Sequence, residues 1–195
     1  MREIFKAFSC KSWIILREET FDSVLETLSL TKVRDDLSWE QALEIGVEQI
    51  KTNNEVETLI FTSPTNGYVI IEGSNLEKKG SIISEKISNG HDFVFNMTID
   101  IWIPYMFVEV FSEGKLIRRI EYDLDVDQNK VDILEVGDKT KWEYKIDYLP
   151  ESPIGYDDFF YPLYFVNSLG IDMPQIEDLF NQKAIILKCK TRTDP

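Results

Sequence analysis

Histidine and cysteine are nearly absent from this chain of 195 residues, which has one His and two Cys. A zinc site built from several His or Cys ligands is therefore disfavoured, and so is a redox site built from closely spaced cysteines. Cys10 and Cys189 stand far apart in the sequence. We expect both to be small buried side chains rather than parts of a disulfide framework.

Positive charge is also scarce, because 35 acidic residues face 21 Lys and Arg and leave a formal net charge of −14. Like charges repel, so phosphate backbones and anionic membrane surfaces are poor partners, and we expect neither nucleic acid nor a membrane to be bound. A basic protein would be attracted. Acidity that serves only the solubility of the chain is the simpler interpretation, since net charge speaks to solubility and association rather than to fold.

Long apolar runs are missing as well. No stretch approaches the ~20 apolar residues of a membrane-spanning helix, and charges at Arg2, Glu3 and Lys6 interrupt the start of the chain. The sequence therefore predicts a cytoplasmic protein. Apolar residues still make up 43% of the chain, which is enough for the core of one domain over residues 1–195.

No recognised catalytic motif is present: Gly-x-Ser-x-Gly and the glycine-rich phosphate loops are both lacking. The single histidine, His91, follows Asn89-Gly90, and no nucleophile stands near it in a recognised arrangement, so it is interpreted as a turn or surface residue. We assign no catalytic residue, metal or cofactor. With this many acids, a pair of carboxylates acting as a small hydrolase or a carbohydrate-acting enzyme stays open as an alternative.

The first half of the chain predicts two helices and a hairpin after a short strand at residues 13–16. Apolar spacing indicates a helix over residues 21–30, and a second helix begins at Ser38, with Gln41 completing a capping box. The pair Asn66-Gly67 separates the β-rich runs 56–62 and 68–73. This pair predicts a tight hairpin turn, because both residues tolerate a positive φ.

The second half predicts more strands and a helical end. A short helix is expected at residues 81–87, and strands at 93–97, 102–111, 116–124, 141–148 and 184–187. Pro104 favours an edge position or a bulge. Helices are expected to run to Leu169 and to begin again after Asp172. The fold class is therefore α+β, an antiparallel meander sheet of five to seven strands with helices packed on one face.

The acidic segment Asp123-Leu-Asp125-Val-Asp127 is the first candidate site. An EF-hand calcium loop needs glycine at its sixth position and glutamate at its twelfth, where this segment has Gln128 and Leu134, so a solvated strand end is the favoured interpretation. Period-two spacing places all three aspartates on one face, where a basic partner could bind. Asp157 and Asp158 form a second candidate patch at an expected helix N-terminus, where carboxylates are stabilised and exposed.

An aromatic cluster lies in the same region: Tyr156, Phe159, Phe160, Tyr161, Tyr164 and Phe165. Helical spacing favours core packing for these rings. They are too many for one helix face, however, and a partner or a second subunit could cover some of them.

Three stretches carry a resemblance: residues 61–73 with Tyr68 after the hairpin glycine, residues 107–118, and the helix leading to Gly170. Together they resemble a group of bacterial α+β proteins that share a Phe-x-Ser/Thr-Pro-x-x-Gly-Trp/Tyr-Val hairpin. That group implies an architecture over residues 56–180 and no catalytic residue. The composition is similar to that of toxin-immunity proteins. The leading hypothesis is a non-enzymatic acidic binding protein, an immunity-type inhibitor of a basic bacterial toxin, and a structural or assembly protein is a further alternative.

Overall fold

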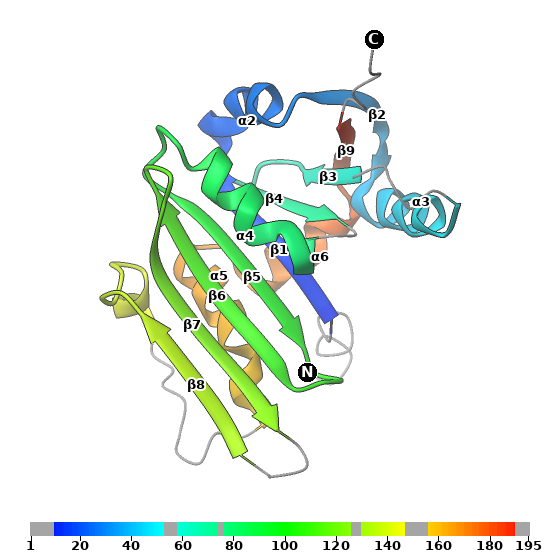
Figure 1. Ribbon diagram of the computed structural model, residues 1–195. Helices are drawn as coiled ribbons and strands as arrows, with labels where there is room; N and C mark the ends of the chain where they lie inside the picture. The colour runs from blue at the N-terminus through cyan, green and yellow to red at the C-terminus, as the bar shows by residue number, and fades with distance from the viewer. Residues whose placement is uncertain (1–9, 53–57, 74–75, 126–129, 147–155, 190–195) are drawn as a thin grey trace.

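A computed structural model describes residues 10–52, 58–73, 76–125, 130–146 and 156–189. It shows a mixed α/β fold around one sheet (Figure 1), with strand order β2-β9-β3-β4-β1-β5-β6-β7-β8 and antiparallel pairing throughout. The strands are β1 (Cys10–Arg17), β2 (Leu30–Ser38), β3 (Thr58–Thr62), β4 (Tyr68–Gly73), β5 (Val94–Asp100), β6 (Tyr105–Ser112), β7 (Lys115–Asp125), β8 (Lys130–Val136) and β9 (Lys183–Cys189).

Helices cover both faces of the sheet. In Figure 1, α4 lies in front of the strands and α5 behind them. The helices are α2 (Phe21–Thr27), α3 (Trp39–Thr52), α4 (Leu76–Ile87), α5 (Tyr161–Ser168) and α6 (Met173–Asn181), with 3₁₀ helices η1 (Glu18–Thr20), η2 (Glu143–Lys145) and η3 (Tyr156–Phe160). Within the described residues, no helix is long and apolar enough to cross a membrane.

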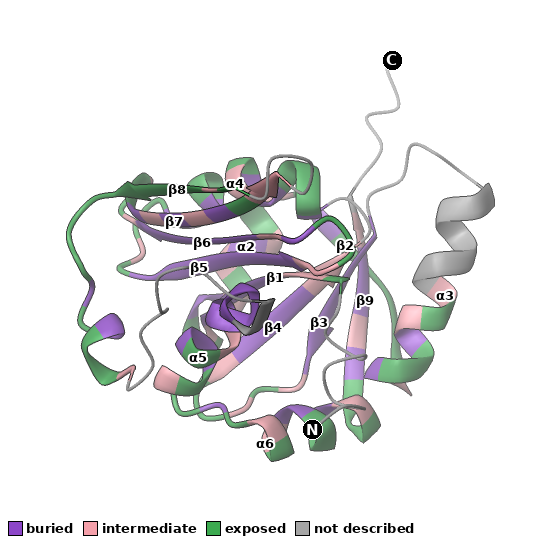
Figure 2. Ribbon diagram, turned by 90° about the horizontal axis from the view of Figure 1, so that it is seen from below, coloured by how far each residue is buried: buried purple, intermediate pink, exposed green. Residues whose placement is uncertain are grey.

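The expectation that helices pack on one face only is wrong. Along β1, Trp13 and Ile15 join the core beneath α5 and α6, whereas Ile14 and Leu16 join a separate core beneath α4 and α2. All four side chains are fully buried, and Figure 2 shows the central strands buried along most of their length. A strand that is apolar on both sides needs cover on both sides, so two helical layers are required.

The sheet also has more strands than expected and is only partly a meander. Strands β5 to β8 follow one another in space, but β1 is inserted between β4 and β5, and β9 between β2 and β3. The edge strands β2 and β8 were not expected, because their side chains are mostly exposed and lack a hydrophobic alternation.

The strand expected at residues 141–148 is wrong over the described part, where η2 stands instead. The expected alternation is absent: Trp142 and Glu143 are both buried, and Tyr144 is 77% exposed. The strand expected from residue 102 begins only at Tyr105, and Pro104 lies in the turn before it. Because β6 is an interior strand whose one register shift lies at Val110 and Phe111, Pro104 marks neither an edge nor a bulge.

Local turn and cap signals are confirmed. Asn66 and Gly67 have φ values of 49° and 77°, and they join β3 to β4 as expected. The side chain of Ser38 accepts from the backbone N–H of Gln41, and the Gln41 side chain accepts from the backbone N–H of Ser38. The aromatic cluster is also largely core, as Phe159, Phe160, Tyr161 and Phe165 are all buried, while Tyr164 is 40% exposed.

Candidate binding surface

One end of the sheet gathers exposed apolar and acidic side chains from neighbouring strands. The turn of residues 101–104 joins β5 to β6 and carries Trp102, which is 77% exposed, and Ile103, which is 59% exposed. The turn is fixed by the backbone N–H of Trp102, which donates to Oδ1 of Asp100 at 2.9 Å. Asp100, Trp102, Ile103, Asp123 and Asp125 are called the acidic sheet end below.

The pairing of β6 with β7 brings the sequence-predicted aspartates to this turn. Asp123 lies opposite Tyr105 in the ladder, and the backbone N–H of Leu124 donates to the carbonyl of Pro104 at 3.0 Å. Asp123 is exposed and Asp125 is half-buried, and alternation along β7 places both on one face. That part of the prediction is confirmed, whereas Asp127 lies outside the described residues.

Arg119 lies on the same face of β7 as Asp123 and Asp125, and it forms ion pairs within the sheet. The guanidinium of Arg119 contacts Glu109, and it donates to Oε2 of Glu121 through Nε at 2.8 Å and Nη2 at 2.6 Å. Glu109 in turn accepts from Ser81 of α4 at 2.6 Å and from Asn96 at 2.8 Å. Arg119 therefore forms ion pairs with two glutamates, and its single positive charge offsets only one of their two negative charges.

Tyr105 closes this network beside Asp123. Its hydroxyl donates to Oε1 of Glu121 at 3.1 Å, and burial, followed by the charge of Glu121, raises the pKa of Tyr105 to about 12. The Arg119 guanidinium also lies 5.4 Å from the centre of the Phe107 ring. The polar side chains next to the acidic sheet end, Tyr105, Glu121 and Arg119, are thus held in place by contacts with one another.

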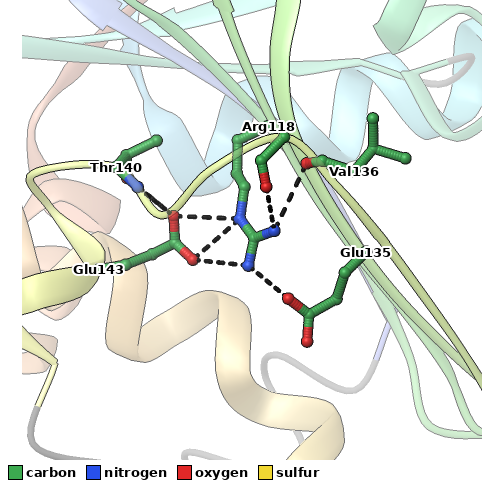
Figure 3. A network of polar contacts seen from close by, with 6 residues as sticks. Arg118, Glu135, Val136, Thr140 and Glu143 are labelled. Atoms are coloured by element: carbon green, nitrogen blue, oxygen red, sulfur yellow. Dashed lines mark hydrogen bonds and ion pairs between the residues drawn. The ribbon is translucent and has the colours of Figure 1, made fainter.

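The preceding residue, Arg118, points to the opposite face and holds a separate network (Figure 3). Its Nε donates to Glu143 at 3.0 Å, its Nη2 to Glu135 at 2.7 Å and its Nη1 to the carbonyl of Gly137 at 2.9 Å. Glu143 also accepts from the backbone N–H of Thr140 at 2.7 Å. This network fastens the segment after β8 to β7, which is a structural task.

Two tyrosines near Arg118 are perturbed mainly by burial. Burial raises the pKa of Tyr161 to about 12, with a smaller contribution from the charge of Glu143. Burial also raises the pKa of Tyr122, which lies on the same side of β7 as Arg118, well above its usual range. Both phenols are therefore neutral core groups at ordinary pH.

In the second predicted patch, Asp158 does not lie at the surface. Asp158 is buried, with 3% of its surface exposed, and the side chain of Asp157 lies outside the described part of the chain. The expected exposure of Asp158 is wrong because the segment forms the 3₁₀ helix η3 against the core instead of the first turn of a surface helix. The α-helix expected to start at Asp157 or Asp158 is α5, and it begins only at Tyr161.

Cys10 also departs from expectation, since it is exposed and free rather than buried. Its Sγ lies 3.7 Å from Oδ2 of Asp100, and the pKa of the thiol is raised by partial burial first and by the Asp100 charge second. A raised pKa keeps the thiol protonated and unreactive at neutral pH. The side chain of Cys189 is not among those described.

His91 has a serine partner that the sequence did not reveal. The Oγ of Ser23 on α2 lies 2.7 Å from Nε2 of His91, but Ser23 also donates its proton to the carbonyl of Thr20 at 2.9 Å. When the hydroxyl proton is engaged by Thr20, Nε2 is the donor to the serine, which is the reverse of what a general base requires. The pair ties α2 to the turn after α4.

Two hollows remain. The larger, about 720 Å³, is lined by Asn66, Lys145, Ile146, Tyr164, Asn167, Ser168, Leu169 and Gly170, without a carboxylate among its described lining. The smaller, about 300 Å³, has Glu18, Glu19 and Asp22 on its wall. Within the described ranges no group of His, Cys, Asp and Glu is arranged to hold a metal ion. The larger hollow therefore lacks the paired acids that the hydrolase alternative needs.

Trp102 is the residue that sequence reasoning missed, because residues 102–111 were interpreted as one strand. The signal was Pro104, two residues later: a proline cannot donate to an interior ladder, so the apolar residues before it belong to a turn.

Comparison of the chain with models of known protein families, with curated proteins and with solved structures gives no significant match.

Proposed function

We propose that this chain is a non-enzymatic binding protein whose acidic sheet end engages a basic protein partner, most concretely as an immunity-type inhibitor of a basic bacterial toxin in the cytoplasm. The observation that carries the proposal is the exposure of Trp102 beside aspartates. The other three tryptophans are buried, with Trp13 and Trp39 at 0% and Trp142 at 7% exposure. Trp102 alone is held out to solvent.

An exposed tryptophan on a fixed turn suits recognition. Tryptophan is enriched among interface residues whose truncation costs about 2 kcal/mol or more, because it buries a large area with few rotatable bonds. The hydrogen bond from Trp102 to Asp100 fixes the backbone of the turn before any partner arrives. Less conformational entropy is then lost on binding.

The carboxylates supply the second part of the argument. Asp123 and Asp125 share a face at the end of β7, and Arg119 on the same face pairs with Glu109 and Glu121. A lysine or arginine of a partner could approach these carboxylates and stack over Trp102 as a cation–π pair. Together with the net charge of −14, this arrangement speeds the encounter with a basic protein and repels acidic ones.

The experiment is a protection assay with the neighbouring gene. If that gene encodes a toxin, co-expression of the wild-type chain should rescue growth, and Trp102→Ala or the double variant Asp123→Asn/Asp125→Asn should lose most of the protection. Tyr144→Ala is the matched control, because Tyr144 has the same 77% exposure on η2 and lies outside the acidic sheet end. Equal protection by Trp102→Ala and wild type would contradict the proposed surface, and no rescue of any adjacent toxin would contradict the immunity function.

A further inference from the structure

The two edges of the sheet are built differently. Edge strand β2 departs from regular pairing twice, with register shifts between Lys32 and Arg34 and between Arg34 and Leu37. Its middle is charged, and Lys32–Asp35 and Arg34–Asp36 form exposed ion pairs at 2.5 and 2.9 Å. Irregular pairing and charge are the usual means by which proteins keep an edge strand from pairing with another chain. The β2 edge is guarded.

The β8 edge lacks the irregular pairing, although it too carries charges, at Lys130, Asp132 and Glu135. All seven residues of β8 pair with β7 in one unbroken register from Lys130 to Val136. Its exposed apolar residues are Ile133 at 53%, Leu134 at 47% and Val136 at 44%, and Figure 2 shows this strand largely exposed. A regular edge strand with exposed apolar residues is a template for a further strand.

The charges of β8 are already matched within the chain. Lys130 and Asp132 form an ion pair at 2.5 Å, and Glu135 receives Arg118 at 2.7 Å. What the strand still offers is an edge of backbone groups and apolar side chains on both faces. An occupant should therefore be a strand that is apolar on both faces and has little net charge, rather than a basic segment.

We propose that β8 pairs antiparallel with β8 of a second copy of this chain, so that two sheets join at their β8 edges around a two-fold axis at Ile133. This edge adjoins the acidic sheet end, because Asp123 and Asp125 lie opposite Asp132 and Lys130 in the β7–β8 ladder, but its occupant is chemically different from the basic partner. The second copy satisfies the requirements just given, because its β8 is the same regular strand with internally matched charges.

The sequence of β8 is self-complementary in the register centred on Ile133. That register pairs all seven residues, with Ile133 opposite its own copy, Asp132 opposite Leu134 and Lys130 opposite Val136. No two like charges then stand opposite each other. Centring the pairing on Asp132 would place two carboxylates face to face, which destabilises a strand pair. Of the possible registers, the one centred on Ile133 is therefore the one that pairs the whole strand and opposes no like charges.

The dependence on salt concentration distinguishes dimerisation through β8 from the binding of a basic partner. Two chains of net charge −14 repel, so screening should strengthen the dimer, whereas the same screening should weaken binding of a basic partner. In sedimentation equilibrium, the full chain should form a dimer whose dissociation constant falls as NaCl is raised. A chain that stays monomeric at all protein and salt concentrations would overturn the proposal and leave the binding function untouched.

A matched pair of variants tests the edge. Ile133→Lys places two like charges opposite each other and removes the central apolar pair, so the dimer dissociation constant should rise at least about 30-fold. Val33→Lys is the control, because Val33 is exposed to 44% on the guarded β2 edge, and its dissociation constant should equal that of wild type. If Ile133→Lys dimerises as wild type does, the dimer uses another surface and the proposal is wrong.

Disulfide trapping gives a readout that does not depend on disrupting the strand. Directly opposite residues of an antiparallel pair have Cα atoms about 4.5–5.5 Å apart, a separation that a disulfide can bridge. In a Cys10→Ser background, which removes the exposed thiol, Ile133→Cys should form an intermolecular disulfide rapidly on mild oxidation, and Val33→Cys should not. Equal yields from the two variants would overturn the proposed pairing.

Discussion

Arg118 offers a sharp test of how burial sets the strength of an ion pair, because one guanidinium holds two different partners. The side chain of Glu143 is 2% exposed, that of Glu135 is 52% exposed, and Arg118 itself is 3% exposed. The distances are similar, at 3.0 Å to Glu143 and 2.7 Å to Glu135. Solvent access is therefore the main difference between the two contacts.

The expected magnitudes differ accordingly. Glu143→Ala leaves the buried charge of Arg118 without its buried partner and the N–H of Thr140 without an acceptor. Breaking a buried pair in this way costs about 3–5 kcal/mol of unfolding free energy. Glu135→Ala removes an exposed partner, and such pairs contribute about 0–1 kcal/mol. The first loss is a large part of the ~5–15 kcal/mol that stabilises a typical domain.

Urea unfolding followed by far-UV circular dichroism measures both losses. Glu143→Ala should move the midpoint to clearly lower urea, and Glu135→Ala should leave it nearly in place. The double variant Arg118→Met/Glu143→Leu should recover part of the loss, because apolar side chains of similar size replace both buried charges while the N–H of Thr140 still lacks its acceptor. Equal losses from Glu143→Ala and Glu135→Ala would refute the argument from burial.

Three further predictions concern packing, ionisation and capping. A Cβ at Gly80 would lie 2.6 Å from Oδ1 of the buried Asn96, so Gly80→Ala should lower the unfolding free energy by about 1–3 kcal/mol in the same urea assay, and an unchanged midpoint would contradict the packing of α4. The pKa of Tyr105 is raised to about 12 from 10.0, so the unfolded chain loses this proton first. Stability should therefore fall as pH rises from 10 to 12, and Tyr105→Phe should reduce that fall; a variant with the wild-type slope would contradict it. Asp172 accepts from the backbone N–H of Gln175 in the cap of α6, and Asp172→Ala should lower the unfolding free energy by about 1 kcal/mol, with no change counting against the cap.

The parts of the fold that the sequence predicted depend on short-range chemistry. Asn66 and Gly67 tolerate the positive φ of a tight turn, and Ser38 with Gln41 closes a cap within four residues. Central strands such as β1 are dense enough in apolar residues to be recognised directly. Asp123 and Asp125 could be placed on one face from their spacing alone.

The missed parts depend on long-range pairing. Strands β2 and β8 lie at the sheet edges, where side chains are exposed and leave no hydrophobic alternation to detect. The alternation near Glu143 resembled a strand because the partner that buries this carboxylate, Arg118, lies 25 residues away. Trp102 could not be placed beside Asp123 from the sequence, since their proximity depends on the register between β6 and β7.

Quenching of Trp102 fluorescence tests most directly whether the exposed anchor stands in a negative local field. Trp102 is the one tryptophan open to quenchers, so Cs⁺ should quench it several-fold more efficiently than I⁻ at low ionic strength, because carboxylates attract the cation and repel the anion. Asp123→Asn/Asp125→Asn should bring the two quenching constants close together. Asp35→Asn/Asp36→Asn makes the same change in net charge on the distant β2 edge and should preserve the difference. Equal quenching by the two ions in the wild-type chain, or equal effects of the two double variants, would contradict an acidic binding surface at Trp102.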